Sequence, residues 1–529
     1  MSTATSQVGP EAVRSIGSCT RLVDRCWFTP SGAAVVELPG GVTAHEIFRR
    51  VSSLQGTLFF DSCPRVAEGV ASSVSGNEQH GSPSNVFAGL GRYSFVAALP
   101  VEVIEAANRR EIPDALRRIR DILTALTVPT IPGLPPFQGG LAGLLGYEFG
   151  LAELGVPSPG VPDVPDVPAI HMGFYDLVAA FDHVTGSGWI LSQGIAPGDV
   201  PTAGMARRTR SLGRLEAFLA AIDKGTDEPS ISVDTGSPAG IEGLTASHDE
   251  QSYRQMVARA IEYVRAGDIF QVNLAQTLEI PFAGRPADLL AATRAVNPAP
   301  FAAFYDLGRG SAVVSGSPER FLQVARGVVR MHPIKGTRPI LSRPEADLFA
   351  GDDLSASDKD RAENVMIVDL VRNDLSRVCR DDSVRVESLC RLERYAYVQH
   401  LVSVVAGWLA AGRTPLDAVL AAVPGGRVTG APKHRACEII GELEGRPRGV
   451  YCGSLGYLGL DGSADWSLLI RSFFSRGARM VFRVGGGITA VSDPLQEYRE
   501  TLDKAEGLLR AVAVAGGRGS RETVGSRPS

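Results

Sequence analysis

The segment FAAFYDLGRGSAVVSGSPERFLQV, residues 301–324, carries three short apolar runs separated by turn-forming residues. The runs 301–306, 312–315 and 321–324 are rich in aromatic and β-branched side chains, with Gly, Ser and Pro between them. Runs of this length and composition predict β-strands. Gaps this short join antiparallel neighbours, because a parallel pair needs a long crossover. The segment therefore predicts an antiparallel sheet.

Comparable runs recur along the chain, and segments with helical spacing stand between them. One of these segments follows the capping-box pattern Ser247-His-Asp-Glu250 and stops at Gly267, so we expect a helix between these signals. Interleaved helices and strands with short strand connections predict an α+β fold rather than a doubly wound parallel sheet. The further strand-like runs are 33–38, 189–193, 269–274, 451–458, 466–473 and 480–484, and the further helical segments are 112–126, 204–223, 358–374 and 434–443.

The chain of 529 residues is too long for one ordinary domain. Residues 226–247 are polar and contain Gly and Pro, which is typical of a linker. We therefore expect an N-terminal region, 1–225, and a second region, 248–515. The Gly- and Ser-containing end of the chain, 516–529, is expected to be a disordered tail.

Composition argues against several classes of function. The formal net charge is −5 and no basic block stands out, so we expect no nucleic-acid partner. No apolar run approaches the roughly 20 residues that span a bilayer, and residues 1–13 lack the pattern of a secretory signal. The seven cysteines form no CxxC pattern and are expected to be reduced. We expect a cytoplasmic protein without membrane association.

Two pairs of acidic residues have helical spacing. Asp360 and Glu363 are three residues apart, as are Glu497 and Glu500, and residues at this spacing share one face of a helix. Two such pairs brought together would form an oxygen-rich site for a hard cation such as Mg²⁺. Taken alone, either pair is more typical of a solvated helix face.

Two glycine-rich segments and two single residues are further candidates. PGGRVTGAPK (424–433) precedes a helical segment and GGG (485–487) follows a strand-like run. Such loops bring backbone N–H groups close to an anion. Lys335, in PIKGT, and His400, in YVQHLVS, have apolar neighbours, and a lysine in such a setting can act as a nucleophile. Taken alone, these features are more typical of structural turns, a surface lysine and a core histidine.

In their order along the chain, these segments resemble the chorismate-utilising enzymes, the family of the anthranilate, aminodeoxychorismate, isochorismate and salicylate synthases. The resemblance is strong over 249–505, extends to PFQGGLAGLLGYEFG (136–150), and is weak before residue 136. It implies two antiparallel β-sheets packed as a sandwich with helices on the outside. The matching segments are GDIFQVNLAQ (267–276), NPAPFAAF (297–304), SGSPERFL (315–322), PIKGTRP (333–339), ENVMIVDLVRNDLSRV (363–378), YVQHLVS (397–403), PGGRVTGAPK (424–433), YCGSLGY (451–457), DWSLLIR (465–471) and GGGITAVSDPLQEYRETLDKA (485–505).

The resemblance implies a magnesium site. Glu363 and Glu500 match the carboxylates that hold Mg²⁺ in the family, and Asp360 and Glu497 match supporting positions. The metal grips the ring carboxylate of chorismate. Asp360 departs from the usual glutamate, and its shorter side chain would need a bridging water to reach the metal.

The resemblance also gives other positions a role. Glu319 matches the general acid that protonates the C4 hydroxyl, which is needed because hydroxide is a poor leaving group at neutral pH. His400 matches the histidine near the departing group. Arg427 stands where relatives usually have serine, and the sequence gives it no role. The implied substrate contacts are Arg471 and Tyr457 with the enolpyruvyl carboxylate, Thr429, Gly430, Gly485, Gly486 and Gly487 in a backbone cradle, and Lys504 near the carboxylate and metal.

Two positions discriminate between members of the family. Water-adding relatives have a lysine where this chain has Gln271, so Gln271 argues against an isochorismate or salicylate synthase. Anthranilate synthases typically have alanine where this chain has Lys335, whereas aminodeoxychorismate synthases have the lysine. Asn273 also resembles that subgroup. The resemblance thus implies that Lys335 attacks C2 and that ammonia then adds at C4. Anthranilate synthase component I remains the alternative, and a non-catalytic regulatory subunit is the alternative outside enzymes.

Two further expectations concern ligands. The chain lacks a GxCxG-type nucleophile segment, so we expect ammonia to come from a separate glutamine amidotransferase subunit. Relatives bind tryptophan in the N-terminal part, and the segment FFDS (59–62) lies where such a pocket is expected, with Asp61 and Ser62 as its candidate residues. The plainer interpretation of this segment is a core strand and turn.

Overall fold

A computed structural model describes residues 19–62, 90–160, 167–199, 204–225, 242–340, 344–394 and 398–516. Residues 226–241 of the expected linker and 517–529 of the expected tail lie outside these ranges. Within the described ranges, no helix is long and apolar enough to cross a membrane.

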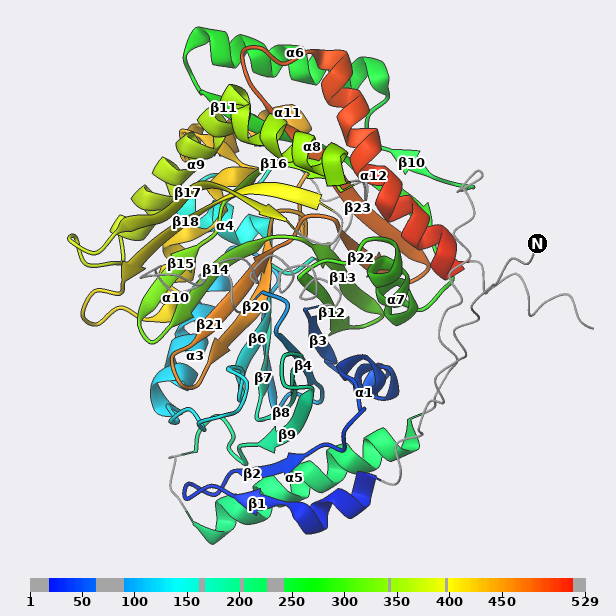
Figure 1. Ribbon diagram of the computed structural model, residues 1–529, viewed down its shortest axis with the longest axis vertical. Coiled ribbons are helices and arrows are strands. Elements are labelled where there is room, and N and C mark those ends of the chain that lie inside the picture. Colours follow the sequence, from blue (N-terminus) through cyan, green and yellow to red (C-terminus); the bar gives the residue numbers. More distant parts are fainter. Residues whose placement is uncertain are drawn as a thin grey trace, which may run out of the picture.

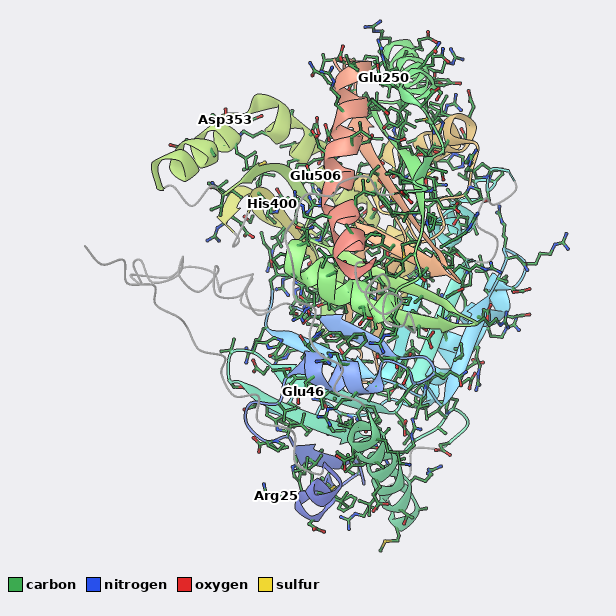
Figure 2. The ribbon with its side chains drawn as sticks, turned by 90° about the vertical axis from the view of Figure 1, so that its right-hand side faces the viewer. Arg25, Glu46, Glu250, Asp353, His400 and Glu506 are labelled. Atoms are coloured by element: carbon green, nitrogen blue, oxygen red, sulfur yellow. The ribbon has the colours of Figure 1, made fainter. Side chains whose placement is uncertain are left out.

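Strands from the whole chain form a large sheet that runs along the molecule (Figure 1). In Figure 2, Arg25, just before β1, lies at the bottom and Glu250, at the start of α6, lies at the top. In the part of the chain that is described, this sheet has 13 strands in the order β1-β2-β9-β8-β4-β3-β12-β13-β22-β23-β11-β10, and β19 pairs with β11. Their bounds are β1 (Trp27–Phe28), β2 (Ala34–Glu37), β3 (Leu58–Asp61), β4 (Tyr93–Ala97), β8 (Leu177–Asp182), β9 (Ser187–Ser192), β10 (Thr245–Ala246), β11 (Gln271–Pro281), β12 (Phe301–Gly308), β13 (Ser311–Ser317), β19 (Gly430–Ala431), β22 (Ser472–Arg476) and β23 (Arg479–Ile488).

A second sheet packs against the first. Among the described residues it has 10 strands in the order β16-β18-β15-β14-β21-β20-β6-β7-β5, and β17 pairs with β18. All pairings in both sheets are antiparallel, as the short connections in 301–324 predicted. The bounds are β5 (Glu102–Ala106), β6 (Gly140–Leu145), β7 (Ile170–Tyr175), β14 (Arg320–Ala325), β15 (Val328–Met331), β16 (Ile334–Pro339), β17 (Arg385–Arg394), β18 (Val398–Trp408), β20 (Ser454–Gly459) and β21 (Ala464–Leu468).

Three layers of core confirm the predicted sandwich with outer helices. Apolar residues from both sheets, among them Phe95, Tyr305 and Leu455, form one buried cluster between them. A second cluster joins the outer face of the larger sheet to α1, α5, α7 and α12, and a third joins the smaller sheet to α3, α4, α9 and α10 (Figure 1). The helices are α1 (Ala44–Val51), α3 (Ile112–Ala125), α4 (Tyr147–Leu154), α5 (Met205–Lys224), α6 (Glu250–Ala266), α7 (Pro286–Val296), α8 (Pro344–Ala356), α9 (Asp358–Ser376), α10 (Pro415–Ala422), α11 (Lys433–Glu444) and α12 (Pro494–Gly516).

Both sheets contain strands from either side of the expected linker. In the larger sheet β3 pairs with β12, so that Phe59 lies opposite Phe304. In the smaller sheet β6 pairs with β20 over the whole of both strands. The expected division of the chain at 225 and 248 therefore does not coincide with the division into sheets. Thr245–Ala246, inside the expected linker, forms β10 and pairs with β11.

The helix expected after Ser247 forms, but its cap differs from the prediction. Asp249 is the N-cap, and its carboxylate accepts the backbone N–H of Ser252 at 2.8 Å. Ser247 cannot cap the helix because its N–H donates to the Thr277 carbonyl and its hydroxyl accepts the Thr277 N–H, both at 2.9 Å. Gly267 ends α6 with a left-handed φ of 85°, as predicted.

Candidate active site

One cavity of about 640 Å³ collects most of the predicted site residues. Its walls come from β16 and β18 of the smaller sheet, β23 of the larger sheet, the two helices α9 and α12, and the loop before β19. These elements lie far apart in sequence, and the sandwich brings them together. The predicted residues that line it are Lys335, Glu363, His400, Arg471, Gly485, Gly486, Gly487, Glu497, Glu500 and Lys504.

Lys335 reaches the cavity from β16. The pairing of β16 with β18 shifts register between Lys335 and Thr337, and Gly336 between them has a φ of 67°. Such a bulge bends a strand and redirects its side chains. Lys335 Nζ lies 2.9 Å from Glu363 Oε2, and the side chain is 16% exposed. Burial lowers the pKa of Lys335, and the carboxylate of Glu363 opposes that shift. Lys335 is therefore not the surface lysine of the plainer interpretation.

Contacts of the next residue, Asn364, set the orientation of Glu363. Asn364 is fully buried where α9 crosses β18, and its amide group contacts the Ser403 hydroxyl and, at 3.4 Å, the Leu401 carbonyl. These contacts fix the rotation of α9, so that Glu363 faces the cavity. Asn364 received no role from the sequence, although a polar residue opening the apolar run 365–368 was a usable signal.

The second carboxylate pair lies on α12, with a lysine one turn later. Lys504 Nζ lies 2.6 Å from Glu500 Oε1 and donates to the Gly485 carbonyl at 2.8 Å. A Cβ atom at Gly486 would lie 3.0 Å from Glu497 Oε2, so glycine at this position lets the helix approach the strand. The carboxylates of Glu497 and Glu500 therefore meet β23 at the cavity wall.

The carboxylates suit Mg²⁺ in their chemistry. Glu363 on α9 and Glu497 and Glu500 on α12 line the same cavity, and Mg²⁺ takes carboxylate oxygens together with water and substrate oxygens. Lysine ammonium groups neutralise Glu363 and Glu500 here. Among the described side chains, no three acidic, histidine or cysteine groups are close enough together to hold an ion. The side chain of Asp360 lies outside the described residues, and the metal site stays a prediction.

Glu319 is buried beside the cavity, with only 3% of its surface exposed. Its carboxylate forms an ion pair with Arg427, the residue that had no role in the sequence. Burial raises the pKa of Glu319, and Arg427 is the strongest opposing influence, followed by Lys335 and Arg471. Burial lowers the pKa of Arg471, and the charge of Arg427 adds to this shift. A carboxyl group with a raised pKa can serve as a proton donor near neutral pH.

His400 lies on β18, left of centre in the upper half of Figure 2. Burial lowers its pKa to about 4, so the imidazole is neutral at physiological pH. Its Nδ1 lies 3.4 Å from the Gly336 carbonyl, which ties the ring to the bulge that carries Lys335.

Gln271 on β11 and Lys335 on β16 both approach Gly487 of β23. The Gln271 side-chain nitrogen occupies the place that a Cβ atom at Gly487 would take, and Lys335 Nζ is 3.7 Å from the same point. Gln271 is 3% exposed. Gln271, which distinguishes this chain from water-adding relatives, therefore lies near Lys335, which distinguishes aminodeoxychorismate synthases from anthranilate synthases.

Thr429 and Gly430 hold the glycine-rich loop instead of lining the cavity. The Thr429 hydroxyl donates to the carbonyls of Gly425 and Gly426 at 3.1 and 3.2 Å. The Thr429 carbonyl accepts the backbone N–H of Asn273 at 2.7 Å, and Gly430 pairs with β11. Arg427 and Val428 of the same loop are the members that reach the cavity.

The tyrosine predicted at the substrate needs a correction. Tyr457 points into the layer between the sheets, where its ring stacks on Phe137 with centroids 4.5 Å apart. Tyr451, at the other end of the segment YCGSLGY, lines the cavity together with Arg471. Tyr457 lies on β20, whose sheet partners fix its side chain inward, whereas Tyr451 precedes the strand.

A buried ionic network, to which sequence analysis assigned no role, lies beside the cavity. Arg448 donates to the Val428 carbonyl at 2.8 Å and to the Asn273 carbonyl at 2.7 Å, so it joins the glycine-rich loop to β11. Glu444 accepts from Arg448 and from Arg483 at 3.1 Å. The network fixes the loop that carries Arg427.

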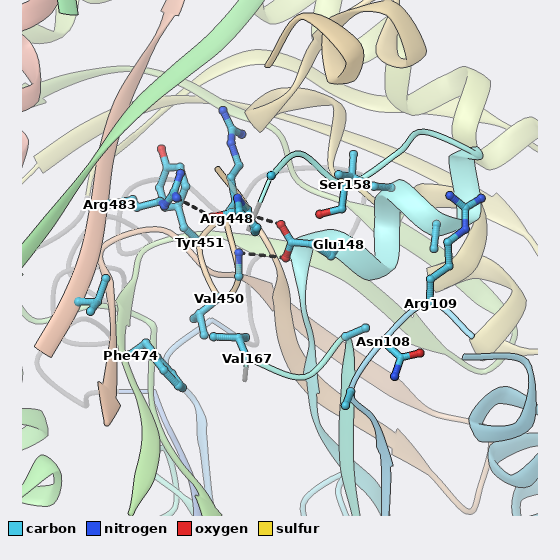
Figure 3. A pocket seen from close by; sticks show the side chains of 18 of the residues that line it. Asn108, Arg109, Glu148, Ser158, Val167, Arg448, Val450, Tyr451, Phe474 and Arg483 are labelled. Carbon is cyan, nitrogen blue, oxygen red and sulfur yellow. Dashed lines mark hydrogen bonds between the residues drawn. The ribbon is translucent and has the colours of Figure 1, made fainter. Parts of the chain in front are cut away.

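Two further cavities contain residues considered above. One of about 350 Å³ shares Tyr451 and Arg483 with the main cavity, and in it Glu148 accepts the backbone N–H groups of Arg448 and Gly449 (Figure 3). The other, of about 110 Å³, is lined by Asp61, Ser62 and Tyr457.

The residues of the expected tryptophan pocket are engaged with neighbours. Asp61 forms an ion pair with Arg294 and accepts the Ser94 hydroxyl at 3.1 Å. The Ser62 hydroxyl donates to the Tyr93 carbonyl. Tryptophan binding stays a prediction.

Comparisons with known proteins agree with this geometry. The sequence model of a family described as chorismate binding enzyme matches residues 81–510. Anthranilate synthase component 1 of Streptomyces coelicolor is 40% identical over 436 residues, which cover 81% of this chain and 82% of that protein. Aminodeoxychorismate synthase component 1 of Klebsiella aerogenes is 39% identical over 377 residues, or 71% of this chain and 78% of that protein.

The solved structures include anthranilate synthase component I from Streptococcus pneumoniae. It matches with a TM-score of 0.65 at 28% identity and covers 83% of this chain and 97% of its own. The fold is thus the one predicted, that of anthranilate synthase component I. Sequence and structure together establish that the chain belongs to the chorismate binding enzyme family.

Proposed function

We propose that this chain is an aminodeoxychorismate synthase component I, which converts chorismate and ammonia to 4-amino-4-deoxychorismate. The observation that carries the proposal is Lys335, a desolvated amine in the cavity that also contains Arg471 and the glycine strip. A buried lysine with a lowered pKa is a competent nucleophile. The product is a precursor of 4-aminobenzoate and hence of folate.

The proposed reaction has two displacement steps. In its neutral form, which burial favours, the Lys335 amine attacks C2 of chorismate, the ring double bond shifts, and the C4–O bond breaks. Glu319 gives its proton to the departing oxygen, which leaves as water. Ammonia then forms a bond to C4, the double bond shifts back, and the C2–N bond to Lys335 breaks. The proton that Lys335 loses on bonding to C2 restores Glu319, and a proton lost by the added ammonia returns to the departing Lys335 nitrogen. The net reaction is chorismate plus ammonia to aminodeoxychorismate plus water.

Other residues of the cavity bind and orient the substrate in this proposal. Arg471 and Tyr451 are suited to one substrate carboxylate, and the backbone of residues 485–487 to the other. Glu363 and Glu500, supported by Glu497 and Asp360, are the proposed Mg²⁺ ligands. When bound, Mg²⁺ would supply positive charge for the ring carboxylate. Neutral His400 can accept a hydrogen bond near the departing group.

Ammonia is proposed to come from a separate glutamine amidotransferase subunit in the cytoplasm. The support is the lack of a GxCxG-type nucleophile segment in this sequence. Adding such a subunit with glutamine should then replace a high concentration of ammonium salt.

The decisive experiment identifies the product made from chorismate, Mg²⁺ and ammonium, with and without an added aminodeoxychorismate lyase. We expect 4-aminobenzoate only when the lyase is present. Lys335→Ala should lose this product, whereas Lys224→Ala, at the exposed end of α5, should keep it. Unchanged activity of Lys335→Ala would overturn the covalent role of Lys335. EDTA and Glu363→Gln should each abolish turnover, and retained activity in both would overturn the Mg²⁺ assignment.

Anthranilate synthase component I is the second candidate. The observation that favours it is the 40% identity to a protein of that name over most of both chains. It predicts anthranilate as the product of the wild-type chain, formed without the lyase and insensitive to Lys335→Ala.

A further inference from the structure

Arg427 links the buried acid to the substrate cavity. It lies on the single turn η2 (Gly426–Val428) and lines the cavity with 23% of its side chain exposed. Glu319, with 4% of its side chain exposed, is not among the described residues that line the cavity. The Glu319 carboxylate, which is suited to give a proton to the substrate, is therefore linked to the cavity by its ion pair with Arg427.

A second guanidinium stands on the same wall. Arg471 lines the cavity and feels the charges of both Arg427 and Glu319. It forms no ion pair of its own within the described ranges. This wall thus carries two guanidinium groups and one carboxylate, and only Arg427 pairs with that carboxylate, so the wall has a net positive charge. An entering carboxylate is attracted to this wall and competes with Glu319 for Arg427.

We propose that Arg427 is a positioning residue that pairs with Glu319 in the empty cavity and exchanges it for a carboxylate of the bound substrate. The inference rests on the proposed function, in which Glu319 is the proton donor. It assigns a role to the cation that replaces the serine usual in relatives.

The exchange couples substrate binding to protonation of Glu319. The charged groups that face this carboxylate are Arg427, Lys335 and Arg471, and Arg427 has the largest effect. When Arg427 turns to the substrate, Glu319 loses its ion pair and gains a negative neighbour. Both changes favour the protonated acid. Glu319 then takes one proton from solvent, passes it to the departing C4 oxygen and regains the proton that Lys335 loses. After product release it returns one proton to solvent and pairs with Arg427 again.

The pH dependence of the rate separates this exchange from a structural role. The alkaline limb of kcat/KM reports Glu319 in the free enzyme, and that of kcat reports it in the substrate complex. Arg427→Met should move the kcat/KM limb upward by about one to three pH units, since a neighbouring arginine lowers a carboxyl pKa by about that much. The same substitution should not shift the alkaline limb of kcat, because Arg427 no longer pairs with Glu319 in the substrate complex. Arg427→Lys should keep the wild-type limb, and Arg254→Met, on the outer face of α6, serves as control.

Proton uptake on chorismate binding tests the same exchange without turnover. Titration calorimetry in two buffers of different ionisation enthalpy would compare Lys335→Ala with Lys335→Ala/Arg427→Met near pH 8, where neither variant reaches the covalent step. We expect uptake approaching one proton in the first variant and clearly less in the second. Equal uptake in both, or limbs of kcat and kcat/KM that shift together in Arg427→Met, overturns the exchange. Loss of the aminated product in the wild type would instead overturn the proposed function and leave the calorimetric result standing.

Discussion

Tyr451 and Tyr457 belong to one segment, YCGSLGY, yet they line different cavities. Tyr451 precedes β20 and faces the cavity that contains Lys335, whereas Tyr457 lies on β20 and stacks against Phe137 between the sheets. Tyr451 lies in the turn before β20, and this turn directs its side chain into a different cavity from that of Tyr457 on the strand.

This separation predicts opposite outcomes for two matched substitutions. Tyr451→Phe removes a hydroxyl from the cavity wall and should raise KM for chorismate about 10- to 100-fold, the range for a hydrogen bond to a charged group. Tyr457→Phe should leave kcat and KM within about twofold of wild type. Steady-state kinetics of both variants, with circular dichroism to confirm folding, checks the assignment. A larger effect from Tyr457→Phe would restore the assignment made from the sequence.

The carboxylate pairs illustrate what could be predicted from the sequence. Their spacing of three residues placed Glu497 beside Glu500, and α9 and α12 form as expected. Helix periodicity is local, so a single sequence suffices for it. The antiparallel character of the sheets was equally local, because short turns reveal it.

The features that could not be predicted from the sequence depend on contacts between distant segments. Nothing near Arg427 in the sequence shows that Glu319 lies against it, and the pairing of β6 with β20 joins residues some three hundred positions apart. A side chain beyond a turn, such as Tyr451, is aimed by packing and not by periodicity. These features need the fold before they can be inferred.

The network around Arg448 predicts a large loss of stability. Its side chain is fully buried and bonds Glu444 and the carbonyls of Val428 and Asn273. Arg448→Met would leave the Glu444 carboxylate and two carbonyls with fewer partners, which costs about 3–5 kcal/mol for a broken buried ion pair. Urea unfolding should show this decrease. Arg254→Met, which removes an exposed pair, should change the unfolding free energy by less than about 1 kcal/mol.

His400 predicts a loss of stability in acid. Burial lowers its folded-state pKa to about 4, below its ordinary value of 6.5. Both states are neutral above pH 6.5, but between pH 6.5 and 4 the unfolded chain binds a proton that the folded chain does not. Stability is therefore lost as pH falls, by about 2 kcal/mol at pH 5 for this residue alone.

The measurement compares unfolding free energies at pH 7.5 and pH 5. His400→Gln should reduce the difference by that amount, although other buried histidines, such as His45, keep their own share. His434→Gln, whose side chain is 56% exposed, should leave the difference unchanged. An unaltered pH dependence in His400→Gln would show that His400 is protonated in the folded chain.

The glycine strip of β23 predicts that two neighbouring alanine substitutions fail for different reasons. A Cβ atom at Gly485 would collide with the Leu274 carbonyl of β11, and backbone cannot move without breaking the sheet. Gly485→Ala should therefore lower the unfolding free energy by about 1–3 kcal/mol, as overpacking does. A Cβ atom at Gly487 would meet the end of the Gln271 side chain, which can move, next to Lys335. Gly487→Ala should therefore fold with near wild-type stability but lose activity by about 10²-fold, the size expected when reacting groups are displaced by about 1 Å. Thermal unfolding and kcat/KM measured on the same preparations separate the two cases, and the reverse pattern would mean that Gln271 is held as rigidly as the strand.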